Sequence, residues 1–473
     1  MTDSGAEVSA GAVPGSALPA GWALATLAEL CEVNPRAFTE EPDDDDLISQ
    51  VPMAAVEAET GRIDPSMHVP YGDLKKKSLT RFQEDDVLFA KITPCMENGK
   101  IAKAQGLAAG RALGSTEFHV LRSHGGVLPE YLMYYLLQRN VRRLAEQHMS
   151  GAVGQRRVPR PYLEGLKIPV PPLTEQHRIV AKLDEQLAHV EAGEAAVGRA
   201  IVETAQLRAS VADAAIQRLA DAPVKQLGEI LAEPLRNGVS AKATQDGSGV
   251  RTLTLSAVTY DEFDDRFTKM TSANPERVAS LWLKDGDIFV ERSNSAELVG
   301  TSAIYHGPSN WAIYPDLLIR ARVDRSVALP DFVALVLRTR RVQFYFRQRA
   351  RGLSGSMPKI DQSTIESVEI PLPSLTRQEE TVRWVQRQEE EIDPLAATVG
   401  QAQAESGNLR AALFHAAFSG ALAPQDPADE PASRLLDRIR TRCEAAAKVK
   451  KPPRKRAPRP RKPTTSGQEA LPL

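Results

Sequence analysis

Two patterns of apolar and polar positions divide the chain. In residues 22–127, and again in 224–328, short runs of β-branched and aliphatic residues alternate with Gly, Pro, Asn and Asp, as in VLFAKI, FHVLR, RTLTLSAV, GDIFVER, TSAIYH and PDLLIRARV. Runs of this length bounded by turn residues predict the strands of a compact, mostly β domain. An apolar segment that begins at Pro129 or Pro330 follows each set of runs, and proline in the first turn predicts that a helix starts there.

The second pattern fills two long, polar, alanine-rich stretches, residues 174–220 and 376–420. Their apolar residues recur at spacings of 3, 4 and 7, which is typical of a coiled-coil seam. Such a helix is roughly 60–70 Å long, and so narrow a seam is not stable alone in water, so we expect the two helices to pack antiparallel. The expected seam comprises Ile179, Leu183, Leu187, Val190, Val197 and Ile201 in the first stretch, and Val382, Val385, Ile392, Leu395 and Val399 in the second.

Prolines set the expected boundaries of these two helices. Thr174 and Thr376 each follow prolines that cannot continue a helix backwards, so we expect these threonines to be N-caps. Pro394 lies inside the second stretch, and we expect it to break or kink that helix.

The two halves of the chain repeat each other. IPVPPLTEQ at 168–176 recurs as IPLPSLTRQ at 370–378, and an offset of 202 keeps the copies in register for about fifty residues. Weaker echoes upstream, at an offset near 201, include Leu128-Pro129 against Leu329-Pro330. The repeat therefore predicts an α+β protein with two pseudo-symmetric domains, mostly β with helices, separated by a pair of long antiparallel coiled-coil helices.

The patterns and the repeat together predict the domain organisation. It comprises a disordered lead-in at 1–20, a first globular domain at 21–172 with its helix at 173–222, a second domain at 223–374 with its helix at 375–420, and a C-terminal extension with a basic, Pro-rich tail at 421–473.

Composition narrows the setting of the protein. Apolar residues make up 42% of the chain and charged residues 25%, but no run is long and apolar enough to predict a membrane span, and the N-terminus lacks the features of a signal peptide. Three widely separated cysteines argue for a reducing cytoplasm and against a disulfide framework or a zinc site. Nine of the 59 basic residues lie in 448–462, so the rest of the chain has 50 basic against 61 acidic residues. Such a chain binds phosphates through local basic surfaces or with partner subunits.

Motifs for covalent chemistry are missing from the sequence. There is no GxxxxGK[ST], GxGxxG or HExxH, and the eight histidines are scattered, so we expect no metal site and no cofactor in this chain. A self-sufficient DNA methyltransferase or nuclease is therefore disfavoured. A coiled-coil adaptor without sequence-specific DNA binding stays open as an alternative.

Basic residues gather after each predicted helix start. Residues 138–160 hold six arginines against one acid, and residues 338–359 hold six arginines and a lysine against none. A solvated helix face is the simple interpretation, but nearby acidic partners are almost absent, which favours contact with phosphates. The cluster recurs in both halves, so we expect the protein to contact nucleic acid twice.

These features resemble the DNA-specificity (S) subunit of type I restriction-modification enzymes. The resemblance rests on the duplicated order of globular domain, glycine loop, IPxPxLT phrase and long helix, on DIFVERSNSAELVGTSAIYHGPSNWAIYPDLLIRARV, which looks like a target-recognition domain of that family, and on the closing segment AFSGALAPQDPADEPASRLLDRIR. It covers about residues 20–440. The departures are Arg377 where the first copy has Glu175, Pro394 inside a helix, and the basic tail.

The resemblance implies a function for each part. Each target-recognition domain would read one half of a split double-stranded DNA sequence, and the paired helices would fix the gap and dock other subunits. Two modification (M) subunits would bind S-adenosylmethionine and methylate adenine, and restriction (R) subunits would use ATP and Mg²⁺ to translocate and cut. The chain itself would be a noncatalytic, cytoplasmic subunit.

On this resemblance, eight residues are expected to contact DNA. They are Lys91, Arg156, Arg157 and Arg160 in the first domain, and Arg292, Asn294, Arg351 and Lys359 in the second. Arg292 and Asn294 follow a predicted strand in the turn ERSNS, where they either reach a base edge or phosphate or simply form the turn. The basic tail is expected to be a disordered arm that attracts DNA without sequence preference.

Overall fold

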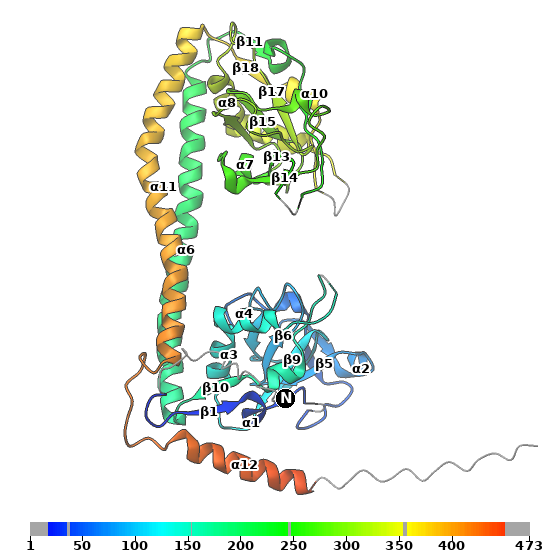
Figure 1. Cartoon of the computed structure of the whole chain (residues 1–473), viewed down its shortest axis with the longest axis vertical. Coiled ribbons are helices and arrows are strands. Elements are labelled where there is room, and N and C mark those ends of the chain that lie inside the picture. The colour runs from blue at the N-terminus through cyan, green and yellow to red at the C-terminus, as the bar shows by residue number, and fades with distance from the viewer. Residues whose placement is uncertain (1–17, 36–37, 153, 245–246, 353–356, 450–473) are drawn as a thin grey trace, which may run out of the picture. The chain divides into compact units, whose positions relative to one another are not determined.

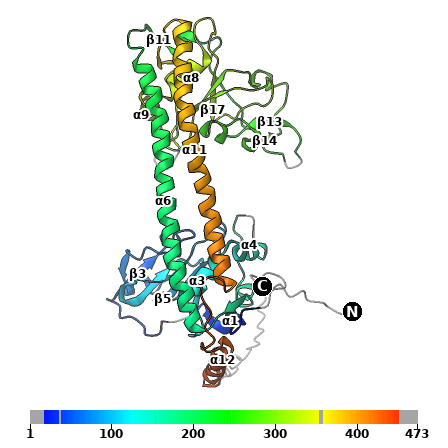
Figure 2. The same cartoon turned by 90° about the vertical axis from the view of Figure 1, so that its left-hand side faces the viewer.

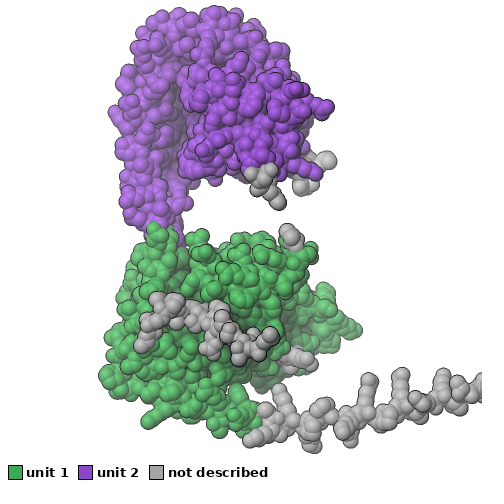
Figure 3. All heavy atoms as spheres, viewed as in Figure 1, with its two compact units in different colours: residues 1–192, 406–473 green, residues 193–405 purple. Residues whose placement is uncertain are grey.

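The computed structural model describes residues 18–35, 38–152, 154–244, 247–352 and 357–449, in two compact units. Unit 1 combines residues up to Ala192 with residues from Ser406 onward, and unit 2 is the continuous stretch Gly193–Glu405 (Figure 3). The predicted lead-in, up to residue 17, and nearly all of the basic tail lie outside the described residues. In the part of the chain that is described, no helix is long and apolar enough to cross a membrane.

Both units contain the same antiparallel four-stranded sheet (Figure 1). In unit 1 its order is β2 (Cys31–Val33), β9 (Phe118–Ser123), β6 (Val87–Ala90) and β7 (Ile101–Lys103). In unit 2 the order is β12 (Arg236–Asn237), β17 (Leu318–Ala321), β15 (Asp287–Glu291) and β16 (Ser302–Tyr305). Each strand of one sheet has its counterpart about 200 residues away, so the duplication read from the sequence is confirmed in three dimensions.

The remaining strands differ between the units. Unit 1 has a second sheet in the order β4 (His68–Pro70), β3 (Leu47–Val51), β8 (Arg111–Gly114) and β5 (Thr80–Gln83). In place of this second sheet, unit 2 has the two-stranded pair β13 (Val250–Leu253) and β14 (Thr268–Thr271). Short helices complete each domain: α1 (Leu27–Leu30) and α2 (Tyr71–Leu74) in unit 1, and α7 (Ser256–Thr259) in unit 2, where the end of the apolar run RTLTLSAV had suggested a strand.

A broken helix follows each shared sheet. Proline opens it as predicted, in α3 (Pro129–Leu137) and α8 (Pro330–Arg338), but the chain turns extended at Gln138 and Thr339 and restarts as α4 (Arg139–Gln147) and α9 (Arg340–Arg349). After α5 (Arg160–Glu164) or α10 (Gln362–Glu366), a strand returns to pair with the first strand of the unit. These pairs are β10 (Lys167–Val170) with β1 (Ala23–Thr26), and β18 (Glu369–Pro371) with β11 (Val224–Gln226).

The two long stretches are the helices α6 (Leu173–Gln217) and α11 (Leu375–Phe418), which pack antiparallel within each unit (Figure 2). In unit 2, Arg208 of α6 pairs with Asp393 of α11, and Asp221, just after α6, pairs with Arg377 of α11. Residue numbers therefore rise along one helix where they fall along the other. Most of the predicted seam is buried or half-buried. Ile201 and Leu395 are exceptions at 41% and 51% exposure, so the spacing rule assigned these two residues to the seam wrongly.

Two expectations about where these helices begin are also wrong. Helix α6 begins one residue before Thr174, whose hydroxyl instead bonds the Asp429 carboxylate. Helix α11 likewise begins before Thr376, and the backbone N–H of Arg377 lies 3.4 Å from the Ser374 hydroxyl, which therefore takes the capping role. Pro394 does not break α11, which continues from Leu375 to Phe418 as one helix.

A buried ion pair occupies the same place in the two shared sheets. Arg122 binds both carboxylate oxygens of Asp86 at 2.8 and 2.7 Å, and Arg322 binds both oxygens of Asp287 at 2.5 and 2.9 Å. Both carboxylates are about 1% exposed. Even beside Arg122, burial raises the pKa of Asp86, which shows how much the loss of water disfavours its charge.

The last helix, α12 (Ala432–Val449), covers only the domain of unit 1. Its backbone starts with a bond from Ala432 N–H to the Gly21 carbonyl, and Arg440 binds the Glu29 carboxylate. Ile439 presses on Gly126 so closely that a Cβ there would lie 2.2 Å from its Cδ1. Unit 2 has Val327, which carries a side chain, at the position equivalent to Gly126.

We expect Gly126→Val to loosen α12 from unit 1. The added side chain must displace Ile439, and overpacking of this kind costs about 1–3 kcal/mol. Amide hydrogen exchange in residues 432–445 should therefore speed up by roughly tenfold or more, while the shared sheet stays protected. Gly193→Val is the matched control because a Cβ at Gly193 meets nothing within 4 Å. Unchanged exchange in α12 would contradict the expectation.

Candidate nucleic-acid interface

In each unit, three backbone segments meet in a small ladder beside the shared sheet. In unit 2 the backbone of Lys359 bonds Arg351 in both directions, at 2.9 and 2.8 Å, and the N–H of Ile360 bonds the carbonyl of Arg292 at 2.9 Å. In unit 1, Arg157 and Ser150 exchange the same two bonds, at 2.8 and 3.0 Å, and the N–H of Val158 bonds the carbonyl of Lys91 at 2.8 Å. We call residues 91–92, 150 and 157–158, and residues 292–293, 351 and 359–360, the bridging ladders.

The ladder of unit 2 brings three of its four predicted DNA-contacting residues together. Arg292, Arg351 and Lys359 line one groove of about 530 Å³, which α10 also borders. Within the described residues none of the three has a carboxylate at ion-pair distance, so their charges face solvent unpaired. A concave surface with unpaired positive charges is suited to a phosphate backbone.

Two further residues of this groove were not among the sequence candidates. Arg349 lies over the Tyr345 ring, 3.9 Å from its centroid, and both border the groove. A flat guanidinium held on an aromatic ring keeps its hydrogen-bond donors available, which suits contact with phosphate or base. The sequence contained a signal, because Arg349 belongs to the basic cluster 338–359, but that cluster does not show which of its members share a surface.

Asp361 is the carboxylate that borders the groove, and it is already engaged. It caps α10 by accepting a bond from the Thr364 N–H at 2.8 Å. Hydrogen bonds from the hydroxyl and backbone of Thr364, and from Ser363, lower the pKa of Asp361 to about 2. Asp361 is therefore ionised at neutral pH, but the four basic residues that line the groove outnumber it, so the groove keeps a net positive charge.

Asn294 has a different role from its neighbour Arg292. Its side-chain amide donates to the Glu291 carboxylate at 2.6 Å, and its side-chain oxygen accepts the Ser295 N–H at 2.8 Å. Glu291 is fully buried, which raises the pKa of its carboxyl group. Of the two interpretations of the turn ERSNS, the structure thus places Asn294 in turn formation and Arg292 in the groove.

In unit 1, acidic residues hold all three predicted arginines. Arg157 forms two bonds with the Glu117 carboxylate, at 2.9 and 2.8 Å, and these bonds lower the pKa of Glu117. Arg160 bonds Glu164 at 2.7 Å, and Arg156 lies 3.6 Å from Glu146. Lys91, by contrast, forms no ion pair within the part of the chain that the structure describes.

Both basic clusters therefore have acidic partners, contrary to the expectation from the sequence. Partners that are distant in sequence fold onto them: Glu117 binds Arg157, Glu59 binds Arg142, Asp261 binds Arg338, Asp213 binds Arg340 and Glu369 binds Arg341. The clusters thus consist of two kinds of residue, paired arginines that hold the domain together and unpaired ones at the ladders and grooves.

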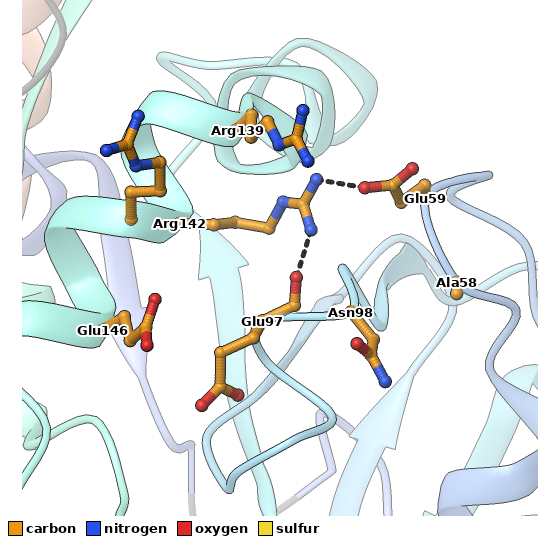
Figure 4. A pocket seen from close by; sticks show the side chains of 8 residues that line it. Ala58, Glu59, Glu97, Asn98, Arg139, Arg142 and Glu146 are labelled. Carbon is orange, nitrogen blue, oxygen red and sulfur yellow. Dashed lines mark hydrogen bonds and ion pairs between the residues drawn. The ribbon is translucent and has the colours of Figure 1, made fainter. Parts of the chain in front are cut away.

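A second groove in unit 1 shows both kinds side by side (Figure 4). Arg142, at 6% exposure, bonds the Glu97 carbonyl and the Glu59 carboxylate and is a structural residue. Arg139 and Arg143 border the same groove, of about 680 Å³, without an ion pair among the described residues. They belong to the basic cluster 138–160 but were not among the eight candidates.

The fold and these surfaces define a duplicated α+β protein in which each repeat joins a mostly β domain, with its own basic surface, to one long helix. Residues 19–194 match the family described as "Type I restriction modification DNA specificity domain". The first repeat is therefore similar to that family, and the chain resembles type I specificity subunits.

Individual proteins support this relationship. The chain is 38% identical over 164 residues to the type I restriction enzyme EcoEI specificity subunit of Escherichia coli. This matched segment covers 34% of this chain but only 27% of that protein. It is 29% identical over 313 residues to the EcoKI specificity subunit of Escherichia coli strain K12, covering 62% and 67% of the two chains. A solved chain from a study of complex assembly and conformational transition of the type I R-M system shares the fold, with a TM-score of 0.58 at 21% identity over 86% of this chain and 100% of that one.

Proposed function

We propose that this chain is the noncatalytic DNA-specificity subunit of a type I restriction-modification enzyme. Each unit contacts one half of a bipartite duplex target through its bridging ladder, with Lys91 in unit 1 and Arg292, Arg351 and Lys359 in unit 2 as the leading contacts. The observation that carries the proposal is the repeated ladder, which places Lys91 and Arg292, two basic side chains without an ion pair among the described residues, at the same point of both domains.

The helices α6 and α11 complete the proposed assembly. They dock two modification subunits, which bind S-adenosylmethionine, and the restriction subunits, which bind ATP and Mg²⁺, in the cytoplasm. The acidic balance of the chain outside its basic tail fits an assembly in which partners supply part of the contact with phosphate.

Mapping adenine methylation across the host genome, with and without this gene, tests the proposal. We expect a split sequence motif that is methylated when the gene is present and unmethylated when it is deleted. Complementation with the Arg292→Ala/Lys359→Ala variant should leave the motif largely unmethylated. An unchanged methylome in an active system would overturn the proposal and favour an adaptor role. Methylation by the purified chain alone would instead indicate a self-sufficient enzyme.

A further inference from the structure

A single buried glutamine joins each domain to its long helix. Gln176 and Gln378 are the fourth residues of α6 and α11, and both are 0% exposed. Each is the last residue of the repeated phrase, IPVPPLTEQ or IPLPSLTRQ. A long polar side chain is rarely buried so completely unless all its hydrogen-bonding groups are satisfied.

The two glutamines make the same three hydrogen bonds. The Gln176 side-chain oxygen accepts the Leu128 N–H at 2.8 Å, and its nitrogen donates to the carbonyls of Gly126 and Pro171, both at 3.1 Å. The Gln378 oxygen accepts the Leu329 N–H at 2.9 Å, and its nitrogen donates to the carbonyls of Val327 and Pro373, at 3.2 and 2.9 Å. Each amide thus ties together the loop before α3 or α8, the proline segment, and the first turn of the long helix.

These bonds require an amide. The site presents one N–H donor and two carbonyl acceptors, and a side-chain amide is the group that offers one acceptor and two donors in this geometry. A carboxylate at the same place would face two carbonyl oxygens without a proton to share. A hydrocarbon would leave one donor and two acceptors unsatisfied in a dry environment.

The residue directly before each glutamine differs between the two units, so the glutamine is the feature that the two domain–helix junctions share. Glu175 is buried and accepts a bond from the Trp22 indole at 3.0 Å, whereas its counterpart Arg377 is half-buried and pairs with Asp221. The junctions therefore differ in the residue beside the glutamine but keep the three amide bonds. What both units retain is a fixed attachment of the α3 or α8 end of the domain to the helix.

We propose that Gln176 and Gln378 are positioning residues that set the angle between each DNA-contacting domain and its helix, and through that angle the spacing of the two half-sites. This inference rests on the proposed function. Each domain meets its helix at several contacts, but the glutamine fixes the helix at its first turn, where a small change of angle is carried along a rigid rod. Loss of the amide should therefore weaken the preference for one gap between the half-sites, while each half-site is still recognised.

The test uses the whole chain assembled with its modification subunits, after methylome mapping has given the natural target. The substrates carry the same two half-sites with the natural gap, one base pair fewer or one base pair more. We expect Gln176→Glu and Gln378→Glu each to reduce the preference for the natural gap by about fivefold to tenfold, the factor expected from losing buried hydrogen bonds. Base preference within each half-site should stay unchanged. Gln206→Glu is the matched control, because it makes the same replacement at an exposed position of α6.

Gln176→Met and Gln378→Met are tested in parallel, because they remove the bonds without adding charge. Circular dichroism and amide exchange at Leu128 and Leu329 report whether each variant folds. If the variants bind all three gaps more weakly but in the wild-type ratio, or if neither replacement folds, the glutamines are merely structural and the inference is wrong. If the wild-type assembly methylates no split sequence, the proposed function fails first, and the two failures are thereby distinguished.

Discussion

Replacing Arg292 and Lys359 together with alanine is expected to weaken binding to the duplex target by roughly 100-fold near physiological salt. Both side chains line the unit 2 groove without a carboxylate partner, so their removal breaks no ion pair within the described part of the protein. Each lost phosphate contact releases one fewer counterion, and the slope of log affinity against log salt should fall by about two units. Fluorescence anisotropy of the assembled complex, measured across a salt series, gives both quantities.

A control with the same charge separates a local contact from general attraction. Arg266→Ala/Lys284→Ala removes two exposed charges from the same unit, at positions away from the groove, where Arg266 already pairs with Asp264. We expect it to change affinity only a few-fold. An equal loss in the two double variants would mean that the groove is not the contact surface. If Arg292 reads a base, its single variant should also relax sequence preference at one position.

Arg122→Ala is expected to have the largest effect on stability, lowering the free energy of unfolding of unit 1 by about 3–5 kcal/mol at pH 7. The substitution leaves the Asp86 carboxylate buried and unpaired. Because its folded pKa already lies above the ordinary 3.8 and would rise further, the folded state would hold a proton that the unfolded chain has released. The deficit should therefore grow as pH rises through the window between the two pKa values, and be smaller at pH 5 than at pH 7.

Amide exchange of β6 and β9 in urea at pH 5 and pH 7 measures this deficit. Lys182→Ala, which removes an exposed pair with Glu185, should cost less than about 1 kcal/mol. Asp86→Asn/Arg122→Met should recover much of the stability, because no buried charge remains. A pH-independent loss would show that Arg122 acts through packing alone. Arg322→Ala should affect unit 2 in the same way, because Arg322 holds Asp287.

Signals that are local in sequence allowed most of the fold to be predicted. The strands around Val87–Ala90 and Asp287–Glu291 follow from short apolar runs, and the starts of α3 and α8 follow from proline in a first turn. The register of the two halves follows from the repeated phrase. The strands and the helix starts depend on residues a few positions apart, where backbone preferences dominate.

The details that could not be predicted depend on long-range contacts. Arg157 looks free in sequence, but Glu117 reaches it from forty residues away, and Thr174 looks like a helix cap, but Asp429 binds its hydroxyl from the far end of the chain. The prediction that Ile201 and Leu395 belong to the seam is wrong for a related reason. The spacing of apolar residues identifies an apolar stripe but not whether a partner covers it. Of the predicted DNA-contacting residues in unit 2, Arg292, Arg351 and Lys359 share one groove and Asn294 bonds within its turn, and their contact with DNA stays a prediction.

The division of the chain into units has a consequence for its synthesis. Unit 2 is continuous, but the core of unit 1 includes Phe414, Phe418, Ala432 and Leu436, which the ribosome makes last. The second repeat can therefore complete its fold while the first still lacks part of its interior. We therefore expect the second repeat to finish folding before the first, and a nascent chain released before residue 414 to hold a folded second repeat and an incomplete first one.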